Sequence, residues 1–245
     1  MTKMKFLGAM AAVATGLATV AAGSLPAAAG DSNGNFQIKA GVSGVWTDDD
    51  TTSLVTSGGV NLLAAGAHAS TDDMVLPTLT LTYFFNRNVA VELFCCFGQT
   101  SVVGEGILRG NGELAETWMF PPILTLQYHF DGFGAVRPYV GAGVEWIHYF
   151  DSKVGKNGLG AASVDLDDSF GFALQAGVDF DLGGGWSLGL DVKKVWEDTE
   201  VTWKFANGTS IKADHDIDPL IATANLGYRF NLDDLFGRRE AAPLK

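Results

Sequence analysis

Residues 75–93, VLPTLTLTYFFNRNVAVEL, contain the pattern that decides the fold. Apolar residues occupy every second position from Val75 to Phe85, and threonines fill three of the positions between them. Asn86-Arg87-Asn88 then supplies turn-forming residues, and the alternation resumes at Val89. A period of two is that of a strand whose two faces meet different surroundings. The stretch therefore predicts an antiparallel hairpin with one apolar and one polar face.

The same alternation recurs along the rest of the chain. With 75–85 and 89–97, the predicted strands are residues 36–46, 124–130, 138–146, 170–180, 186–192 and 220–230. Most approach the roughly 9–11 residues that a tilted strand needs to cross a bilayer. The connections are short after the second, fourth and sixth strands and long after the first and third. We therefore predict an all-β fold, an eight-stranded antiparallel transmembrane β-barrel over residues 30–230, with both termini periplasmic.

The placement of charge separates this fold from a soluble β-sandwich or lipocalin-like barrel, which would also alternate. In most of the predicted strands the apolar face carries no charged residue. Such a face suits lipid, and charges on the opposite face would then pair inside the barrel. The expected interior polar network consists of Lys39, Glu92, Arg137, Glu145, Asp179, Asp191, Lys193 and Arg229.

The N-terminus has the features of a secretory signal peptide. Lys3 and Lys5 precede an apolar run from Phe6 to Val20, and small residues around Ala29 suit cleavage. The alternative, a membrane anchor, is disfavoured because the run is shorter than the roughly 18–20 residues of a helical span. We expect residues 1–29 to direct export to the outer membrane, and residues 231–245 to form a periplasmic C-terminal tail.

Composition excludes several classes of function. The net charge of -12 and the lack of a basic cluster argue against nucleic-acid binding. We expect no cofactor and no metal, because the acidic clusters, such as Asp48-Asp49-Asp50, lack the spacing of a calcium loop. Divalent ions bridging these acids to lipopolysaccharide remain an alternative. An enzyme is also not expected: only His148 with Ser152 suits a nucleophile–base pair, and no catalytic signature surrounds them.

Several segments, taken in order, resemble the OmpW family of bacterial outer-membrane proteins over about residues 36–230. They are residues 76–81, 121–130, 137–143, 175–179 and 218–230. The resemblance implies an eight-stranded barrel with a narrow, largely apolar channel that helps small hydrophobic molecules cross the outer membrane. Two features depart from the family: the chain continues from Asn231 to Lys245, and Lys193-Lys194 interrupts the seventh predicted strand.

Two features of the residues themselves suggest a pathway for such a solute. The first long loop is unusually apolar, so its leucines either pack on the barrel rim or form a hydrophobic mouth. Prolines at strand ends either end the strands or loosen the ladder enough for a lateral opening. The candidate pathway residues are Leu54, Leu62, Leu63, Pro77, Pro121 and Pro122.

The predicted function is therefore a channel for small hydrophobic molecules across the outer membrane. The alternative is a structural or adhesive barrel through which nothing passes. The expected partners are outer-membrane lipid, lipopolysaccharide and a small hydrophobic solute, with the protein acting as a monomer.

Overall fold

The computed structural model describes residues 34–48, 50–156 and 159–231. The predicted signal peptide and the expected C-terminal tail beyond Asn231 lie outside these residues. Within them, no helix is long and apolar enough to cross a bilayer.

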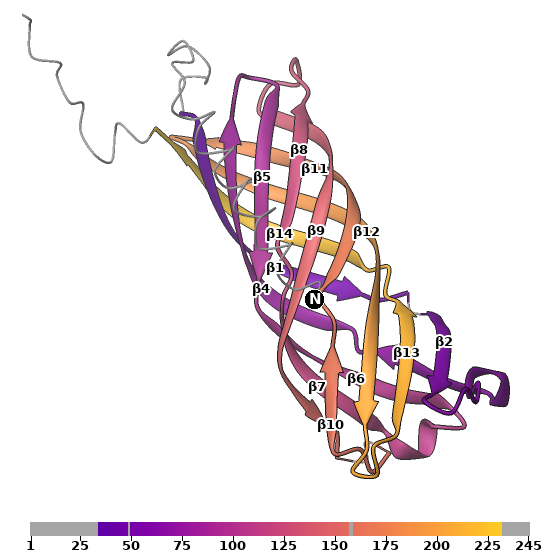
Figure 1. The fold of residues 1–245 in the computed structure, drawn as a ribbon. Helices are drawn as coiled ribbons and strands as arrows, with labels where there is room; N and C mark the ends of the chain where they lie inside the picture. Colours follow the sequence, from indigo (N-terminus) through magenta and orange to yellow (C-terminus); the bar gives the residue numbers. More distant parts are fainter. Residues whose placement is uncertain (1–33, 49, 157–158, 232–245) are drawn as a thin grey trace, which may run out of the picture.

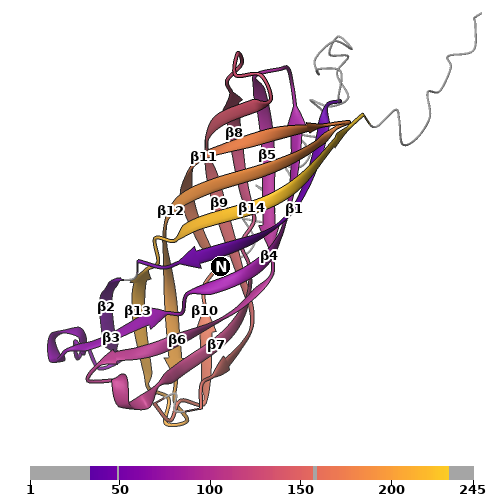
Figure 2. The same cartoon turned by 180° about the vertical axis from the view of Figure 1, so that it is seen from behind.

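Eight antiparallel strands form a closed ring, as the sequence predicts (Figures 1 and 2). β1 pairs with β4 on one side and with β14 on the other, so the described part of the ring has no free edge. In ring order the strands are β1 (Phe36–Trp46), β4 (Met74–Phe84), β5 (Val89–Cys96), β8 (Ile123–His129), β9 (Val136–Val154), β11 (Ser169–Gly183), β12 (Trp186–Lys204) and β14 (Leu220–Phe230).

The connections at one end of the ring are tight turns, and those at the other end contain further strands. We call the first the turn end, which also holds Phe36 and Phe230, and we call the second the loop end. The connections after the first and third predicted strands are long, as expected, but they contain strands that the sequence analysis did not predict: β9 and β12 run far beyond their predicted ends, and the long connections pair beside them. The added strands are β2 (Asp50–Thr56), β3 (Ala67–Thr71), β6 (Gly98–Gly106), β7 (Glu113–Phe120), β10 (Ser163–Leu166) and β13 (Ser210–Asp216).

The polarity of the two faces reverses along β12. From Trp186 to Trp196 the outward residues are mostly apolar and exposed, while inward Asp191 and Lys193 are buried. Beyond that point Val201 and Trp203 are buried inside, and the outward positions carry polar residues. A strand crossing from lipid into water requires this reversal, because the solvent outside the sheet changes.

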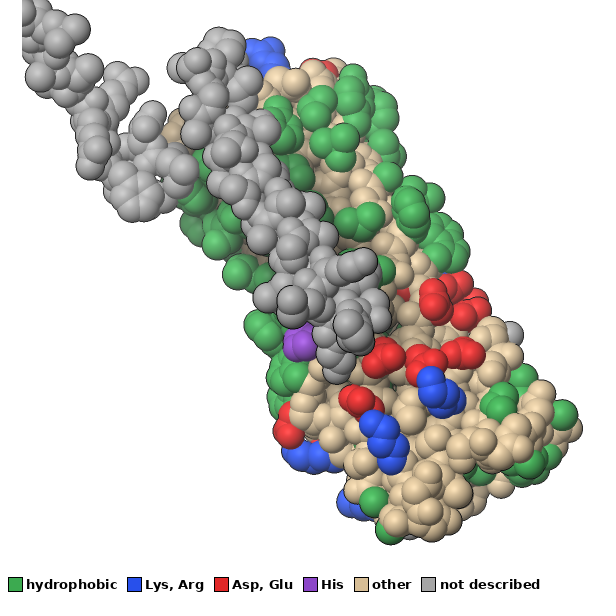
Figure 3. All heavy atoms as spheres, viewed as in Figure 1, with side chains coloured by type: hydrophobic (Ala, Val, Ile, Leu, Met, Phe, Trp, Pro, Cys, Tyr) green, Lys and Arg blue, Asp and Glu red, His purple; other side chains and the backbone are tan. Residues whose placement is uncertain are grey.

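The surface follows the same division. Hydrophobic side chains cover much of the turn-end half, and most charged side chains on the visible face gather over the loop-end half (Figure 3). The charged groups on the loop-end strands pair as on a soluble protein: Lys212 Nζ donates to Glu200 Oε1 at 2.6 Å, and this contact raises the pKa of Lys212. Lys193-Lys194 does not interrupt β12, contrary to the sequence analysis, because Lys193 points into the barrel.

One close approach of neighbouring strands yields a test of the barrel. A Cβ at Gly143 on β9 would overlap the carbonyl oxygen of Leu124 on β8, whereas a Cβ at Gly110 would meet nothing. Gly143→Ala should therefore lower the stability of the refolded barrel by about 1–3 kcal/mol, the usual cost of overpacking. Urea unfolding in lipid bilayers measures this, with Gly110→Ala as the control. Equal unfolding midpoints for the two variants would contradict the β8–β9 packing.

Candidate functional site

A layer of paired charges lies inside the turn-end half of the barrel. Lys39 on β1 reaches across to Asp179 on β11, and its Nζ lies 2.9 Å from both carboxylate oxygens. Both side chains are buried. Since the outer face of these strands is apolar, the polar residues point inward and can be satisfied only by one another.

A second group of charges lies in the same layer. Lys193 Nζ lies 3.3 Å from Glu92 Oε1 and also contacts Asp191. Gln175 Nε2 donates to Glu92 Oε1 at 2.8 Å and to Asp191 Oδ2 at 2.6 Å, and Tyr139 OH donates to Asp191 Oδ2 at 3.2 Å. We refer to Lys39, Asp179, Lys193, Glu92, Asp191 and Gln175 together as the charged layer. It leaves no room for a wide aqueous pore.

An apolar cavity lies between the charged layer and the loop end. Its volume is about 60 Å³, whereas one water needs roughly 10–15 Å³ by this measure. A smaller cavity of about 30 Å³ lies at the turn end, and the two share no lining residue. Phe94 lines the larger cavity and its ring centroid lies 4.4 Å from Lys193 Nζ, so the charged layer forms the cavity floor. Other apolar side chains of the lining are Leu76, Met119, Ile147, Val201 and Ile221.

The wall of this cavity contains a gap in strand pairing. The β5–β8 ladder ends at Phe94 and Ile123, and the β6–β7 ladder begins at Gly98 and Met119. Residues 95–97 and residues 120–122 therefore do not pair with each other, although Cys95 and Cys96 pair with β4 and Phe120 pairs with β9 on their other sides. Two of them, Pro121 and Pro122, cannot donate a backbone hydrogen bond.

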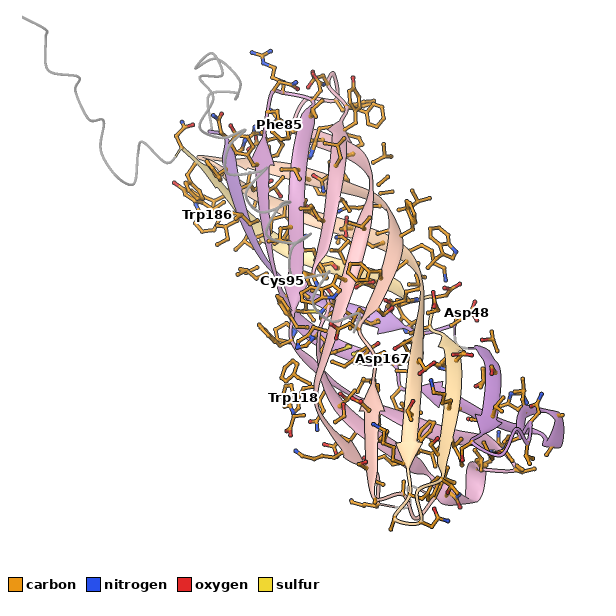
Figure 4. The ribbon with its side chains drawn as sticks, in the orientation of Figure 1. Asp48, Phe85, Cys95, Trp118, Asp167 and Trp186 are labelled. Carbon is orange, nitrogen blue, oxygen red and sulfur yellow. The ribbon has the colours of Figure 1, made fainter. Side chains whose placement is uncertain are left out.

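Two stacked rings cover this gap on the outside. The centroids of Phe97 and Phe120 are 4.7 Å apart, and Phe97 is 61% exposed. Cys96 and Pro121 face inward and line the cavity. Figure 4 labels Cys95, which stands close to the gap along the barrel, between Phe85 at the turn end and Trp118 toward the loop end. At this position no ladder joins the two neighbouring strands of the cavity wall, and the two stacked rings lie over the interruption.

The predicted pathway residues are not gathered at one site. Only Pro121 lines the cavity. Pro122 follows it at the gap, and Pro77 lies exposed on the outer face of β4. Leu54 is buried in the core of the loop-end strands, and Leu62 and Leu63 pack against that core. The geometry thus favours packing for the three leucines and a break in the ladder for the proline pair.

The predicted interior residues divide into three groups. Lys39, Glu92, Asp179, Asp191 and Lys193 form the charged layer. Arg137 and Arg229 line the small turn-end cavity, and Arg229 Nε donates to the carbonyl of Gly34 at 2.8 Å. Glu145 belongs to none of the ion pairs of the charged layer: it lines the apolar cavity, together with Glu197.

Sequence reasoning missed Glu197, Phe97 and Phe120 as residues of the site. Glu197 lies on the part of β12 that the predicted strand 186–192 leaves out, so its inward direction was not assigned. The period-two pattern itself, continued past residue 192, would have placed Glu197 on the same face as Asp191 and Lys193. The Phe97–Phe120 contact joins two strands whose pairing only the folded barrel reveals.

The described residues contain no group of three or more His, Cys, Asp or Glu side chains arranged to hold a metal ion. His148 and Ser152, the one pair considered for catalysis, bind different partners. His148 Nδ1 lies 2.8 Å from Asp168 Oδ1, and Ser152 Oγ lies 2.9 Å from Thr117 Oγ1.

Comparison with known proteins identifies the family. The family model described as OmpW family matches residues 32–230. The chain belongs to the OmpW family. An uncharacterized outer-membrane protein of Sinorhizobium fredii is 34% identical over 205 residues, which cover 80% of each chain. The dibenzothiophene metabolism operon protein PahQ of Pseudomonas aeruginosa is 32% identical over 131 residues, 54% of this chain and 59% of PahQ.

A solved structure gives the same result. The outer-membrane protein OprG of Pseudomonas aeruginosa superposes with a TM-score of 0.73 at 30% identity, covering 81% of this chain and 96% of OprG. This OmpW-family protein is thus an outer-membrane β-barrel, and the predictions of family, fold and localisation are confirmed. The exposed apolar residues of the turn-end half face the lipid of that membrane.

The charged layer makes a direct prediction about stability. Lys39→Met removes the partner of buried Asp179 and should destabilise the barrel by about 3–5 kcal/mol, the usual cost of breaking a buried ion pair. Lys153→Met breaks an exposed pair with Asp151, 2.8 Å apart, and should leave the unfolding midpoint nearly unchanged. Urea titration in bilayers, followed by tryptophan fluorescence, compares them. An unaltered midpoint for Lys39→Met would show that the pair does not hold the barrel together.

Proposed function

We propose that this OmpW-family barrel lets small hydrophobic molecules cross the outer membrane. The observation that carries the proposal is the apolar cavity, whose side wall lacks backbone pairing between residues 95–97 and residues 120–122 and whose floor is the charged layer. In our proposal the loop end faces the exterior, a solute enters the cavity there, and it leaves sideways between Phe97 and Phe120 into the lipid.

A lateral route is favoured over an axial one by the energetics of the charged layer. An apolar molecule moving along the barrel axis would have to separate the Lys39–Asp179 and Lys193–Glu92 pairs without replacing their partners. Leaving such buried charges unpaired costs several kcal/mol. Moving the rings of Phe97 and Phe120 breaks no ion pair, and it gives the solute access to lipid.

The relatives support an apolar cargo. PahQ takes its name from an operon of dibenzothiophene metabolism, and dibenzothiophene is an apolar aromatic compound. A cavity lined mainly by Phe, Leu, Ile, Met and Val side chains suits molecules of this kind. The proposal includes a monomer that acts without catalysis and without a cofactor, in contact with lipid and with lipopolysaccharide at its loop end.

Narrowing the cavity should reduce transport. A Cβ at Gly98 would lie 3.0 Å from both δ carbons of Leu76 and 3.4 Å from Met119 Cε, two flexible side chains of the lining. Gly98→Leu should therefore assemble normally but lower uptake of toluene into proteoliposomes at least severalfold. Gly110→Leu, which projects into open space, is the control. Unchanged uptake through Gly98→Leu would remove the cavity from the route.

Closing the gap should have the same effect. Cysteines in place of Phe97 and Phe120, in a chain whose Cys95 and Cys96 are replaced by alanine, can be joined by a short cleavable thiol cross-linker. Cross-linking should stop toluene uptake, and reduction should restore it. The matched control joins cysteines at Tyr128 and Val140, paired outward residues on an intact ladder.

The same assays distinguish the alternative function. Uptake that persists after cross-linking at the gap would overturn the lateral route. No uptake of any apolar solute by the unmodified protein would favour a structural or adhesive barrel instead.

A further inference from the structure

Two carboxylates stand side by side in the otherwise mainly apolar cavity. Glu145 on β9 and Glu197 on β12 both pair in register with Gly171 of β11, which lies between them. Both are inward-facing and buried, and both line the cavity. Gly171 has no side chain, so nothing but backbone separates the two acids along the wall.

These acids are under-satisfied, unlike those of the charged layer. Glu145 is 2% exposed, and its Oε2 has no hydrogen-bond partner among the described residues. Glu197 receives one weak side-chain contact, 3.4 Å from Ser169 Oγ. The described residues that line the cavity include neither lysine nor arginine, and the His215 side chain, which also lines it, has its Nδ1 3.4 Å from Thr51 Oγ1. Lys193 in the floor is already shared by Glu92 and Asp191.

A buried carboxylate without a partner is costly, so this arrangement is suited to a positive charge that arrives with a ligand. The position of Glu145 adds a second constraint. It pairs in register with Ile123, the residue that directly follows Pro122 at the gap. A molecule whose charged group meets Glu145 would therefore lie beside the lateral opening, with its apolar part against Phe94 and Met119.

We propose that the cavity of this protein selects small apolar molecules that carry a single ammonium group, which Glu145 and Glu197 bind together. The inference rests on the proposed function and names a class of cargo for the same cavity. An ammonium group offers three N–H donors, enough to serve both carboxylates at once. A carboxylate-bearing solute would be repelled, and a neutral solute would enter without this contact.

Two methionines make the cavity directly observable. Met74 and Met119 both line it, so their ¹³C-labelled methyl groups report occupancy by NMR in lipid nanodiscs, whatever partitions into the lipid. The probes are hexylammonium, 1-hexanol and hexanoate, which share one apolar chain. Hexylammonium should shift both methyl resonances with the highest affinity, hexanol should bind more weakly, and hexanoate should bind least.

Isosteric amides test the two acids. The double variant Glu145→Gln, Glu197→Gln should weaken hexylammonium binding by roughly tenfold to a hundredfold, since hydrogen bonds to charged groups are worth about 1.5–3 kcal/mol. Hexanol binding should change little. Glu105→Gln, an exposed acid outside the cavity, is the control. If the double variant does not assemble, as judged by gel mobility before and after heating, Glu145→Gln alone and the three ligands on the natural protein decide the matter.

The outcomes separate this inference from the proposed function. Equal affinity of the natural protein for hexanol and hexylammonium overturns the inference, because the acids would then act only as neutral hydrogen-bonding groups. Equal loss of both ligands in the double variant also overturns it. Neither result affects toluene uptake, which tests the channel itself. Selective hexylammonium binding without toluene uptake would support the site while refuting the proposed route.

Discussion

The charged layer is the interaction on which the rest of this barrel depends. A closed ladder whose outer face meets lipid must direct its polar side chains inward, and in an eight-stranded barrel those side chains meet at the axis. Lys39 with Asp179, and Lys193 with Glu92 and Asp191, satisfy one another there. The same pairs fill the barrel, so an apolar molecule moving along its axis would have to separate them.

Between this layer and the loop end, the requirement on the two faces of the strands is reversed. The loop-end strands stand in water, so they bury apolar residues such as Val201 and Trp203 and expose charged ones. The cavity arises where the two arrangements meet, because the inward face there changes from charged to apolar along the same strands. In the wall of this space, between the charged floor and the apolar rim, the ladder between neighbouring strands is interrupted where the rings of Phe97 and Phe120 stack.

This arrangement also accounts for the two acidic residues that line a mainly apolar cavity. Glu197 lies two inward positions beyond Lys193 on β12, and Glu145 faces the cavity from β9 across Gly171 of β11, so both acids lie on the loop-end side of the charged layer. The proposed hydrophobic path and the proposed charge-specific contact therefore share one cavity and do not lie at different ends of the molecule.

The sequence by itself determined the eight membrane strands, because lipid outside and charge inside impose strict alternation, as residues 75–93 show. It also predicted the inward direction of charges such as Lys39 and Asp179, but it left out Glu197. The loop-end strands were not predicted, because their apolar residues point inward and their polar residues point outward. The alternation alone does not show which solvent surrounds a strand. Only the tertiary structure decided that Leu54 packs in the core of the loop-end strands and does not line a route. It also decided that Glu145 lines the cavity and does not belong to the charged layer. Those outcomes depend on strand register around a closed ring, which relates residues far apart in the chain and is not encoded in any local pattern.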